Sequence, residues 1–201
     1  MGNIEKFDSI AEQYDTAERI MVADAISEHI RRSVGGFAGK RAIDYGCGTG
    51  LVGLRLLDVF RQILFIDASP KMVECVKRKI EDSHAQNADA LQCDLLVENP
   101  SGLKTDYIIV AQVLLHIKDV ELFLRRLRPV LNDGGHLLIV DFDKNNEVVS
   151  TEVHNGFDQQ ALGATVRRCG YTLIRSSTFY YGSKMFMNKD ASLFMLDAEK
   201  Q

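Results

Sequence analysis

An acidic residue followed by alternating glycines forms the segment of this sequence whose spacing most directly suggests ligand binding. In AIDYGCGTGLVG, Asp44 precedes Gly46, Gly48 and Gly50, and a G-x-G-x-x-G pattern runs from Gly48 to Gly53. Such glycines let a loop turn sharply and let its backbone approach a ligand where a Cβ atom would collide. The segment therefore predicts a loop that holds a nucleotide-type cofactor, and the alternative is a tight turn that holds none.

Asp44 distinguishes two kinds of cofactor. A dinucleotide places its pyrophosphate at the N-terminus of the helix after the loop, where negative charge is favoured, and a carboxylate would oppose it. A cofactor with a cationic amino-acid end and no phosphate would instead be stabilised. S-adenosylmethionine is such a cofactor, because it carries a sulfonium and an ammonium group. Asp67, which ends the next predicted strand, can bind ribose hydroxyls of either cofactor and does not discriminate.

Strand and helix patterns alternate around this loop. Ser69 and Pro70 are expected to open one of the helices as N-cap and first residue. Repetition of strand and helix predicts a parallel sheet covered on both faces, with ligands beyond the carboxyl ends of its strands. Strands are expected at residues 41–45, 62–67, 90–94, 107–113 and 136–141, and further helices at 51–60 and 120–131.

The ends of the chain depart from the repeat. Residues 7–33 carry apolar side chains near helical spacing and predict one or two amphipathic helices. Near the C-terminus, Asp158 is expected to cap a helix that runs to Arg168 and is ended by Gly170.

The last part of the chain predicts two strands, at residues 171–181 and 192–196, joined by a polar loop at 182–190. Because no helix separates them, they should pair antiparallel. No repeat, low-complexity segment or linker divides the chain, so a single domain over residues 1–201 is expected.

Composition excludes several classes of protein. Of the 201 residues 46% are apolar and 26% charged, as in an ordinary globular domain, and the net charge of −4 argues against a nucleic-acid partner. No apolar run approaches the ~18 residues of a membrane span, and the start of the chain lacks the features of a signal peptide. The four cysteines form no C-x-x-C pair, so we expect reduced thiols, no zinc site and a cytoplasmic protein.

Several segments together resemble the class I S-adenosylmethionine-dependent methyltransferases, and the likeness is specific from Lys40 to Phe142. AIDYGCGTG resembles their motif I, D/E-x-G-x-G-x-G. FIDAS and QCDLL resemble the segments that end strands two and three, and FDSIAEQYD resembles the F-D-x-x-A-x-x-Y-D opening of small-molecule members. The implied fold is α/β and Rossmann-like, a doubly wound seven-stranded sheet of order 3-2-1-4-5-7-6 with strand seven antiparallel. That order agrees with the strand pair expected at the C-terminus.

The resemblance also implies where the cofactor binds. Asp44 and the loop backbone would hold the methionine end, Asp67 the ribose, and Asp94 with Leu95 the adenine, while Tyr14 would lie over the cofactor. The cofactor-binding positions that carry over are Tyr14, Asp44, Gly46, Cys47, Gly48, Asp67, Ala68, Met72, Asp94, Leu95, Ala111 and Gln112.

Within the single domain we expect three parts. Residues 1–36 would form an N-terminal helical lid, because methyl transfer needs a cover that excludes water. Residues 37–143 would form the cofactor-binding core. Residues 144–201 would supply a substrate-side loop, the last helix and the antiparallel strand pair.

Methyl transfer from a sulfonium depends mainly on alignment, and a general base helps only if the acceptor arrives protonated. His116 and His154 are the candidate catalytic residues. Alternatively, His116 caps or packs at a helix start, and His154 lies on a surface turn. Asp141 and Asp143 lack a third carboxylate at a fitting position, so no metal site is expected.

The predicted function is methyl transfer to a small-molecule acceptor at O, N, S or C, in a monomer or homodimer. The absence of [D/N]-P-P-Y after the fourth strand, where the chain has AQVL, disfavours the amino-group methylases of the resembled family. Two rivals remain. One is a non-catalytic relative that binds the cofactor or regulates a partner, and the other is an NAD-dependent oxidoreductase.

Overall fold

A computed structural model describes residues 4–33, 39–98, 100 and 102–201. Its strands form one seven-stranded sheet of order β3-β2-β1-β4-β5-β7-β6, in which β7 runs antiparallel to both neighbours. This confirms the predicted topology. The strands are β1 (Arg41–Tyr45), β2 (Gln62–Asp67), β3 (Ala88–Gln92), β4 (Thr105–Ala111), β5 (Leu131–Phe142), β6 (Tyr171–Phe186) and β7 (Lys189–Lys200).

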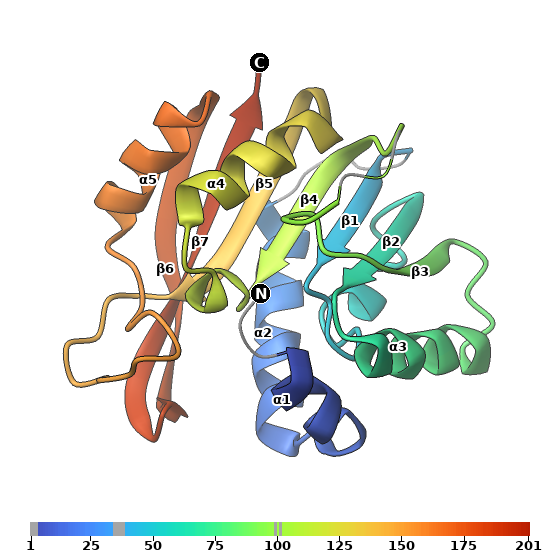
Figure 1. The fold of residues 1–201 in the computed structure, drawn as a ribbon, viewed down its shortest axis with the longest axis horizontal. Helices are drawn as coiled ribbons and strands as arrows, with labels where there is room; N and C mark the ends of the chain where they lie inside the picture. Colours follow the sequence, from blue (N-terminus) through green and yellow to red (C-terminus); the bar gives the residue numbers. More distant parts are fainter. Residues whose placement is uncertain (1–3, 34–38, 99, 101) are drawn as a thin grey trace.

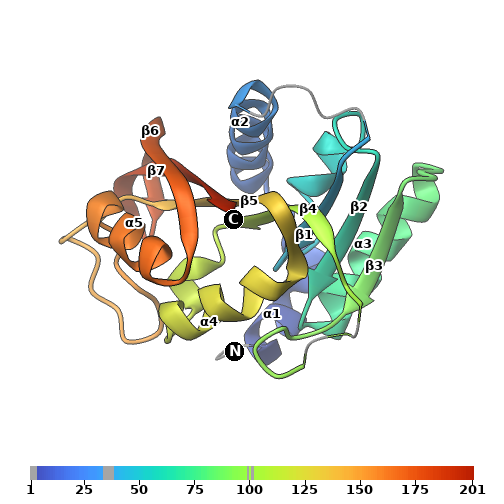
Figure 2. The same ribbon diagram turned by 90° about the horizontal axis from the view of Figure 1, so that it is seen from above.

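Helices cover both faces of the sheet. Figure 2 shows α2 on one side and α4 on the other. The buried apolar residues accordingly form two large clusters: one contains α2 and α3 side chains, and the other contains those of α4 and α5. The α-helices are α1 (Ile4–Ile10), α2 (Ala17–Ser33), α3 (Pro70–Asp82), α4 (Val120–Leu127) and α5 (Gln159–Arg168), and the 3₁₀ turns are η1 (Ala11–Gln13), η2 (Gly53–Leu56), η3 (Leu114–His116) and η4 (Arg128–Val130).

The predicted helix caps are present. The Ser69 hydroxyl accepts a hydrogen bond from Met72 N, and Pro70 is the first residue of α3. Asp158 caps α5 by accepting from Ala161 N, and Gly170 follows the helix with a φ of +90°. In each case a short polar side chain satisfies one of the amide groups that a helix start leaves free.

Two predicted elements were the most wrong in extent, and β5 also begins five residues before the strand predicted at 136–141. Residues 51–60 form only the 3₁₀ turn η2, because Gly53 must stay close to β1 and β2, where Asp44 accepts its amide hydrogen. The expected polar loop at 182–190 is mostly strand, since Met187 and Asn188 adopt φ of +50° and +62° and close the hairpin in two residues. The hairpin therefore reaches beyond the sheet, at the end where the parallel strands terminate (Figure 1).

The N-terminal segment consists of two unlike parts. In α2, Ile26 and Ile30 are fully buried in the first apolar cluster, whereas α1 has no buried residue. Only α1 and η1 thus have the peripheral packing of a cover. The expected boundary between residues 36 and 37 lies outside the described residues.

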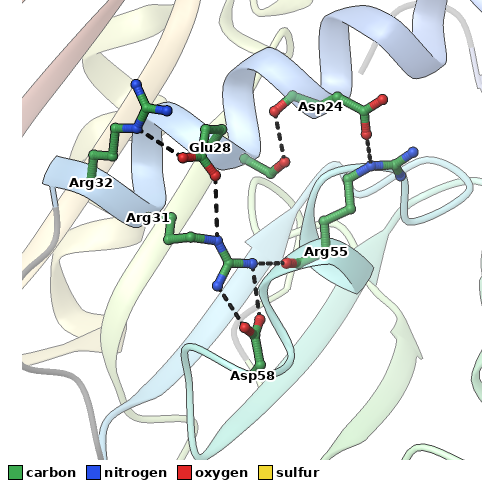
Figure 3. A network of polar contacts seen from close by, with 7 residues as sticks. Asp24, Glu28, Arg31, Arg32, Arg55 and Asp58 are labelled. Atoms are coloured by element: carbon green, nitrogen blue, oxygen red, sulfur yellow. Dashed lines mark hydrogen bonds and ion pairs between the residues drawn. The ribbon is translucent and has the colours of Figure 1, made fainter.

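A polar network fastens α2 to the segment that follows the glycine loop (Figure 3). The Arg31 guanidinium donates two hydrogen bonds to the Asp58 carboxylate, at 2.6 and 2.9 Å, and one to the carbonyl of Arg55 at 2.6 Å. The Arg55 guanidinium pairs with Asp24 and donates to the Leu51 carbonyl at 2.6 Å. Planar, bidentate contacts of this kind fix orientation as well as distance, so α2 is held in one position over the sheet.

Among the residues that the structure describes, none of the helices is both long enough and apolar enough to cross a membrane.

We predict that Ile26→Ala lowers the free energy of unfolding by about 2–5 kcal/mol, because it removes fully buried methyl groups and leaves a cavity. Urea denaturation measures the loss. Ile10→Ala is the matched control in α1, where the side chain is only partly buried, and it should cost less than half as much. Equal losses would contradict the division of the N-terminal segment into a core helix and a cover.

Candidate functional site

The structure places a cavity of about 430 Å³ at the carboxyl ends of β1, β2, β4 and β5. Figure 1 shows α1 and the tip of the β6–β7 hairpin at this same end of the sheet. Residues from all of these elements line the cavity. It therefore lies where the strand order changes direction, between β1 and β4, as ligand sites in open α/β sheets do.

The glycine loop forms one wall of the cavity. Gly46, Gly48 and Gly50 have φ of +68°, +54° and +84°, a left-handed conformation that side chains rarely adopt. A Cβ atom on Gly46 would also lie 2.5 Å from a Val113 methyl, and one on Gly53 would lie 2.5 Å from Asp44 Oδ2. Gly53 thus serves close packing against the sheet and not contact with a phosphate.

Asp44 ends β1 beneath this loop and is only 2% exposed. Its Oδ2 accepts a hydrogen bond from Gly53 N at 3.1 Å. Burial raises the pKa of Asp44 to about 7, and the nearby charge of Asp67 adds to the rise. A cationic ligand beside Asp44 would stabilise the ionised form of its carboxyl group, whereas an anionic ligand would destabilise that form.

Asp67 ends β2 on the other side of the loop. Its Oδ2 accepts from Gly48 N and its Oδ1 from Ser69 N, both at 2.9 Å. Burial raises its pKa as well. Each carboxylate oxygen can accept more than one hydrogen bond, so Asp67 can still bind two neighbouring hydroxyls.

Most of the predicted cofactor-binding residues line the cavity. These are Tyr14, Asp44, Gly46, Cys47, Gly48, Asp67, Ala68, Met72, Ala111 and Gln112. Asp94 and Leu95 are not among its lining residues. Leu95 packs in the second apolar cluster, and Asp94 accepts hydrogen bonds from Tyr45 Oη and Leu96 N, so their role at the adenine stays a prediction.

Two acidic residues attach the segment from α1 to Asp15, which we propose as the cover of the cavity, to the core. Asp8 of α1 accepts hydrogen bonds from the Ser69 hydroxyl and Lys71 N at the start of α3. Asp15 accepts from the Thr49 hydroxyl and from Lys79 Nζ, both at 2.5 Å. The cover is thus joined directly to the glycine loop and to α3, the two elements that surround Asp67.

Sequence reasoning missed several lining residues. Arg19 stands 4.2 Å from the centre of the Tyr14 ring and donates to the Tyr14 carbonyl at 2.9 Å. The sequence contained one indication that Arg19 lies near the cavity, namely its position about one helical turn after Tyr14 and Asp15. Lys184 and Met185 line the cavity from the hairpin, and they were not found because residues 182–190 were predicted to form a polar loop.

His116 lies in the cavity wall, edge-on to Phe7 of the cover at 5.2 Å. Its Nδ1 is buried and has no hydrogen-bond partner among the residues that the structure describes. Burial, with a smaller contribution from Lys6, lowers the pKa of His116 to about 4. The ring is therefore neutral at pH 7.

His154 does not line the cavity. Its Nε2 lies 2.8 Å from the Ile117 carbonyl, and its amide donates to the Leu115 carbonyl at 2.8 Å. Asp141, which is fully buried, holds the same turn from the sheet by accepting from Leu115 N at 3.0 Å. Both residues fix the turn η3 that carries His116.

No group of three potential metal ligands occurs within the described parts of the chain. The Asp143 carboxylate is surrounded by neutral donors, from Gln159, Thr178 and Ser192. Its contacts are those of a structural acceptor at the base of the hairpin.

Comparison with known proteins agrees with this geometry. A family model described as a methyltransferase domain matches residues 43–137. This range includes the glycine loop, β2, β4 and the three acidic residues predicted to bind the cofactor, Asp44, Asp67 and Asp94. The ubiquinone biosynthesis O-methyltransferase of Bradyrhizobium diazoefficiens is 27% identical over 114 residues, which are 57% of this chain and 44% of that protein. The chain thus spans less than half the length of this relative.

Solved structures share the fold. An S-adenosylmethionine-dependent methyltransferase from Aquifex aeolicus superposes with a TM-score of 0.71 at 17% identity, over 95% of this chain and 97% of its own. The [4+2]-cyclase SpnF superposes with a TM-score of 0.74 at 19% identity, over 88% of this chain and 80% of its own. The chain thus carries a methyltransferase domain over residues 43–137 and has the fold of the class I S-adenosylmethionine-dependent methyltransferases.

We predict that the stability of this protein depends on pH through Asp141. Burial raises the pKa of Asp141 from 3.8 to about 7, so between these values the folded state binds a proton that the unfolded state has released. The free energy of unfolding must then fall as pH rises through this window, by about 2–3 kcal/mol from pH 5 to pH 8.

Asp141→Asn removes this dependence, and urea denaturation at several pH values measures it. Asp44 titrates in the same direction but is present in both proteins, so the comparison of slopes isolates Asp141. Parallel curves for the two proteins would contradict the prediction.

Proposed function

We propose that this protein transfers the methyl group of S-adenosylmethionine to a small-molecule acceptor. The observation that carries the proposal is a pair of carboxyl groups, the buried Asp44 and the partly buried Asp67, which face one cavity on either side of the glycine loop. Burial and the charge of Asp67 raise the cost of ionising Asp44, and a cationic ligand would relieve that cost. A pyrophosphate in the same place would increase it.

The residues present fit the cofactor. Asp44 would accept hydrogen bonds from the ammonium group of the methionine end. Arg19 donates to the Tyr14 carbonyl, and its guanidinium, which has five N–H donors, would also bind the carboxylate of the methionine end. Asp67 would accept from the two ribose hydroxyls, while Ala68 and Met72 line the part of the cavity next to it. When bound there, S-adenosylmethionine supplies an electrophilic methyl group.

The acceptor would occupy the other half of the cavity, over β4, β5 and the hairpin. This half is lined by Leu115, His116, Phe142 and Met185. These side chains would align the acceptor and exclude water, which are the main demands of an in-line displacement. The ubiquinone biosynthesis relatives act in the formation of a small molecule, and they support an acceptor of that kind.

His116 is the predicted catalytic residue that this half contains. As a neutral imidazole it can accept a hydrogen bond from a hydroxyl or amine of the acceptor and take its proton as the methyl group transfers. His154 would act through the turn it holds, as a positioning residue.

We predict that S-adenosylhomocysteine raises the thermal midpoint of the protein and that NAD does not. At ~100 times its Kd a ligand adds about 2.7 kcal/mol of stability. Asp44→Asn should weaken S-adenosylhomocysteine binding about tenfold or more, the effect of losing a hydrogen bond to a charged group, as measured by calorimetric titration.

Asp106→Asn is the matched control, because Asp106 lies at the start of β4, where it accepts hydrogen bonds from Arg41 N and Asn132. It should leave binding unchanged. Hydrogen exchange gives a second readout: the ligand should slow exchange in α1 and η1 more than in α2. Stabilisation by NAD alone would refute the proposal.

We further predict that His116→Asn lowers kcat at least about 100-fold and changes the Kd of S-adenosylhomocysteine less than about twofold. The assay measures formation of S-adenosylhomocysteine from S-adenosylmethionine in the presence of a metabolite extract. Because the pKa of His116 is about 4, kcat should not fall between pH 8 and pH 6 through this group. His84→Asn, at an exposed turn after α3, is the matched control, and an equal loss in both variants would count against a role for His116.

A further inference from the structure

The β6–β7 hairpin contributes a basic side chain to the acceptor half of the cavity. Lys184 and Met185 line the cavity just before the two-residue turn. Two ring stacks fix the hairpin there: Phe186 on Phe142 at 4.1 Å, and Phe179 on His29 of α2 at 4.0 Å. The hairpin is therefore a wall of the cavity with a defined position.

The backbone of Lys184 is held independently of its ammonium group. Its φ of +56° is unusual for a residue other than glycine, and its amide donates to Asp190 Oδ1 at 2.9 Å. The Asp190 carboxylate is thus engaged by the backbone and not by the side chain of Lys184.

The ammonium group of Lys184 has neither an ion pair nor a hydrogen bond within the part of the chain that the structure describes. Several other lysines differ, since Lys6, Lys79, Lys189 and Lys200 form ion pairs, and what sets Lys184 apart is that it lines the cavity. A cation at the rim of a cavity without a protein partner is available to a ligand.

The charges of the cavity are unevenly distributed along the sheet. Its acidic groups belong to β1, β2 and the start of α2, namely Asp44, Asp67 and Glu18. The strand order separates β2 from β5 by two strands and places β7 and β6 beyond β5. The walls formed by β4, β5, the turn η3 and the hairpin therefore combine apolar side chains, one amide, a neutral histidine and one cation. Beyond the two aspartates, the remaining lining charges, Glu18 and Arg19, come from α2.

We propose that the acceptor carries an anionic group, a carboxylate or a phosphate, which binds Lys184 while an apolar part of the molecule packs on Leu115, Phe142 and Met185. This inference rests on the proposed function. It makes the acceptor an amphipathic acid whose charged end points to the hairpin and whose reacting atom points toward His116 and the methyl donor.

The test measures binding of simple probes to the protein saturated with S-adenosylhomocysteine. Benzoate and phenyl phosphate are the anionic probes, benzamide is the neutral match, and benzylamine is the cationic one. We expect at least one anion to bind about fivefold more tightly than benzamide, the scale of a partly exposed charge pair. The stronger of the two anions identifies the group.

Lys184→Met should reduce the preference for the anion to less than twofold. Lys189→Met is the matched control, since Lys189 lies on the same hairpin but pairs with Glu147 and does not line the cavity, and it should retain the preference. Equal binding of anion and benzamide, tighter binding of benzylamine, no binding of either anion, or an unchanged preference in Lys184→Met would each overturn the inference. Failure of S-adenosylhomocysteine to bind the unmodified protein would instead refute the proposed function.

Discussion

The contact between the Asp44 carboxylate and Gly53 is the constraint on which the site depends. It joins the end of β1 to a residue nine positions later, and a Cβ atom at Gly53 would occupy the place of the carboxylate oxygen. The intervening loop must then turn through three glycines in left-handed conformations. The same contact keeps an acid beneath a loop of backbone amides, so that the site can hold a cation where many α/β proteins hold a phosphate.

Buried charge on the sheet also organises the opposite half of the cavity. Asp141 stands near the end of β5 as Asp44 stands near the end of β1, and both carboxyls accept hydrogen bonds from backbone amides. Asp44 accepts from the turn that follows its own strand, and Asp141 accepts from the turn that follows the neighbouring strand β4. Each therefore fixes the loop that lines one half of the cavity. The energetic cost of burying both groups is considerable, because burial raises the pKa of each to about 7. Perturbed pKa values of this kind cluster at functional sites.

The parts of the fold that could be predicted are those set by local chemistry. The cap at Ser69, the cap at Asp158, the acids at the strand ends and the parallel core all follow from residue type and spacing. Residues 51–60 could not be assigned correctly, because a 3₁₀ turn and a helix share the same apolar spacing over one turn, and the contact of Gly53 with β1 decides between them. The length of the hairpin was missed for a similar reason. Its outer residues include Met185, Phe186 and Met187 in a row between polar residues, so they lack the alternation of apolar and polar side chains that reveals a strand.

The residues of the candidate site also divide into those that local sequence predicts and those that only tertiary packing places. Asp44 and Asp67 were predicted because they follow strands directly, whereas Arg19 and Lys184 reach the cavity only through the placement of α2 and of the hairpin. His154 lies beside Ile117 through a contact across 37 residues, which no local pattern contains.

The two-residue turn at Met187 and Asn188 has a consequence for how this protein can change. Both residues are exposed, and the turn lies outside the apolar clusters that hold the sheet together, so residues can be inserted or exchanged there at little cost to the core. The cofactor half, in contrast, is fixed by glycines that tolerate no side chain. The sequence of the hairpin wall can therefore diverge while the sequence of the glycine loop stays constant. A change of acceptor would then not require a change of methyl donor.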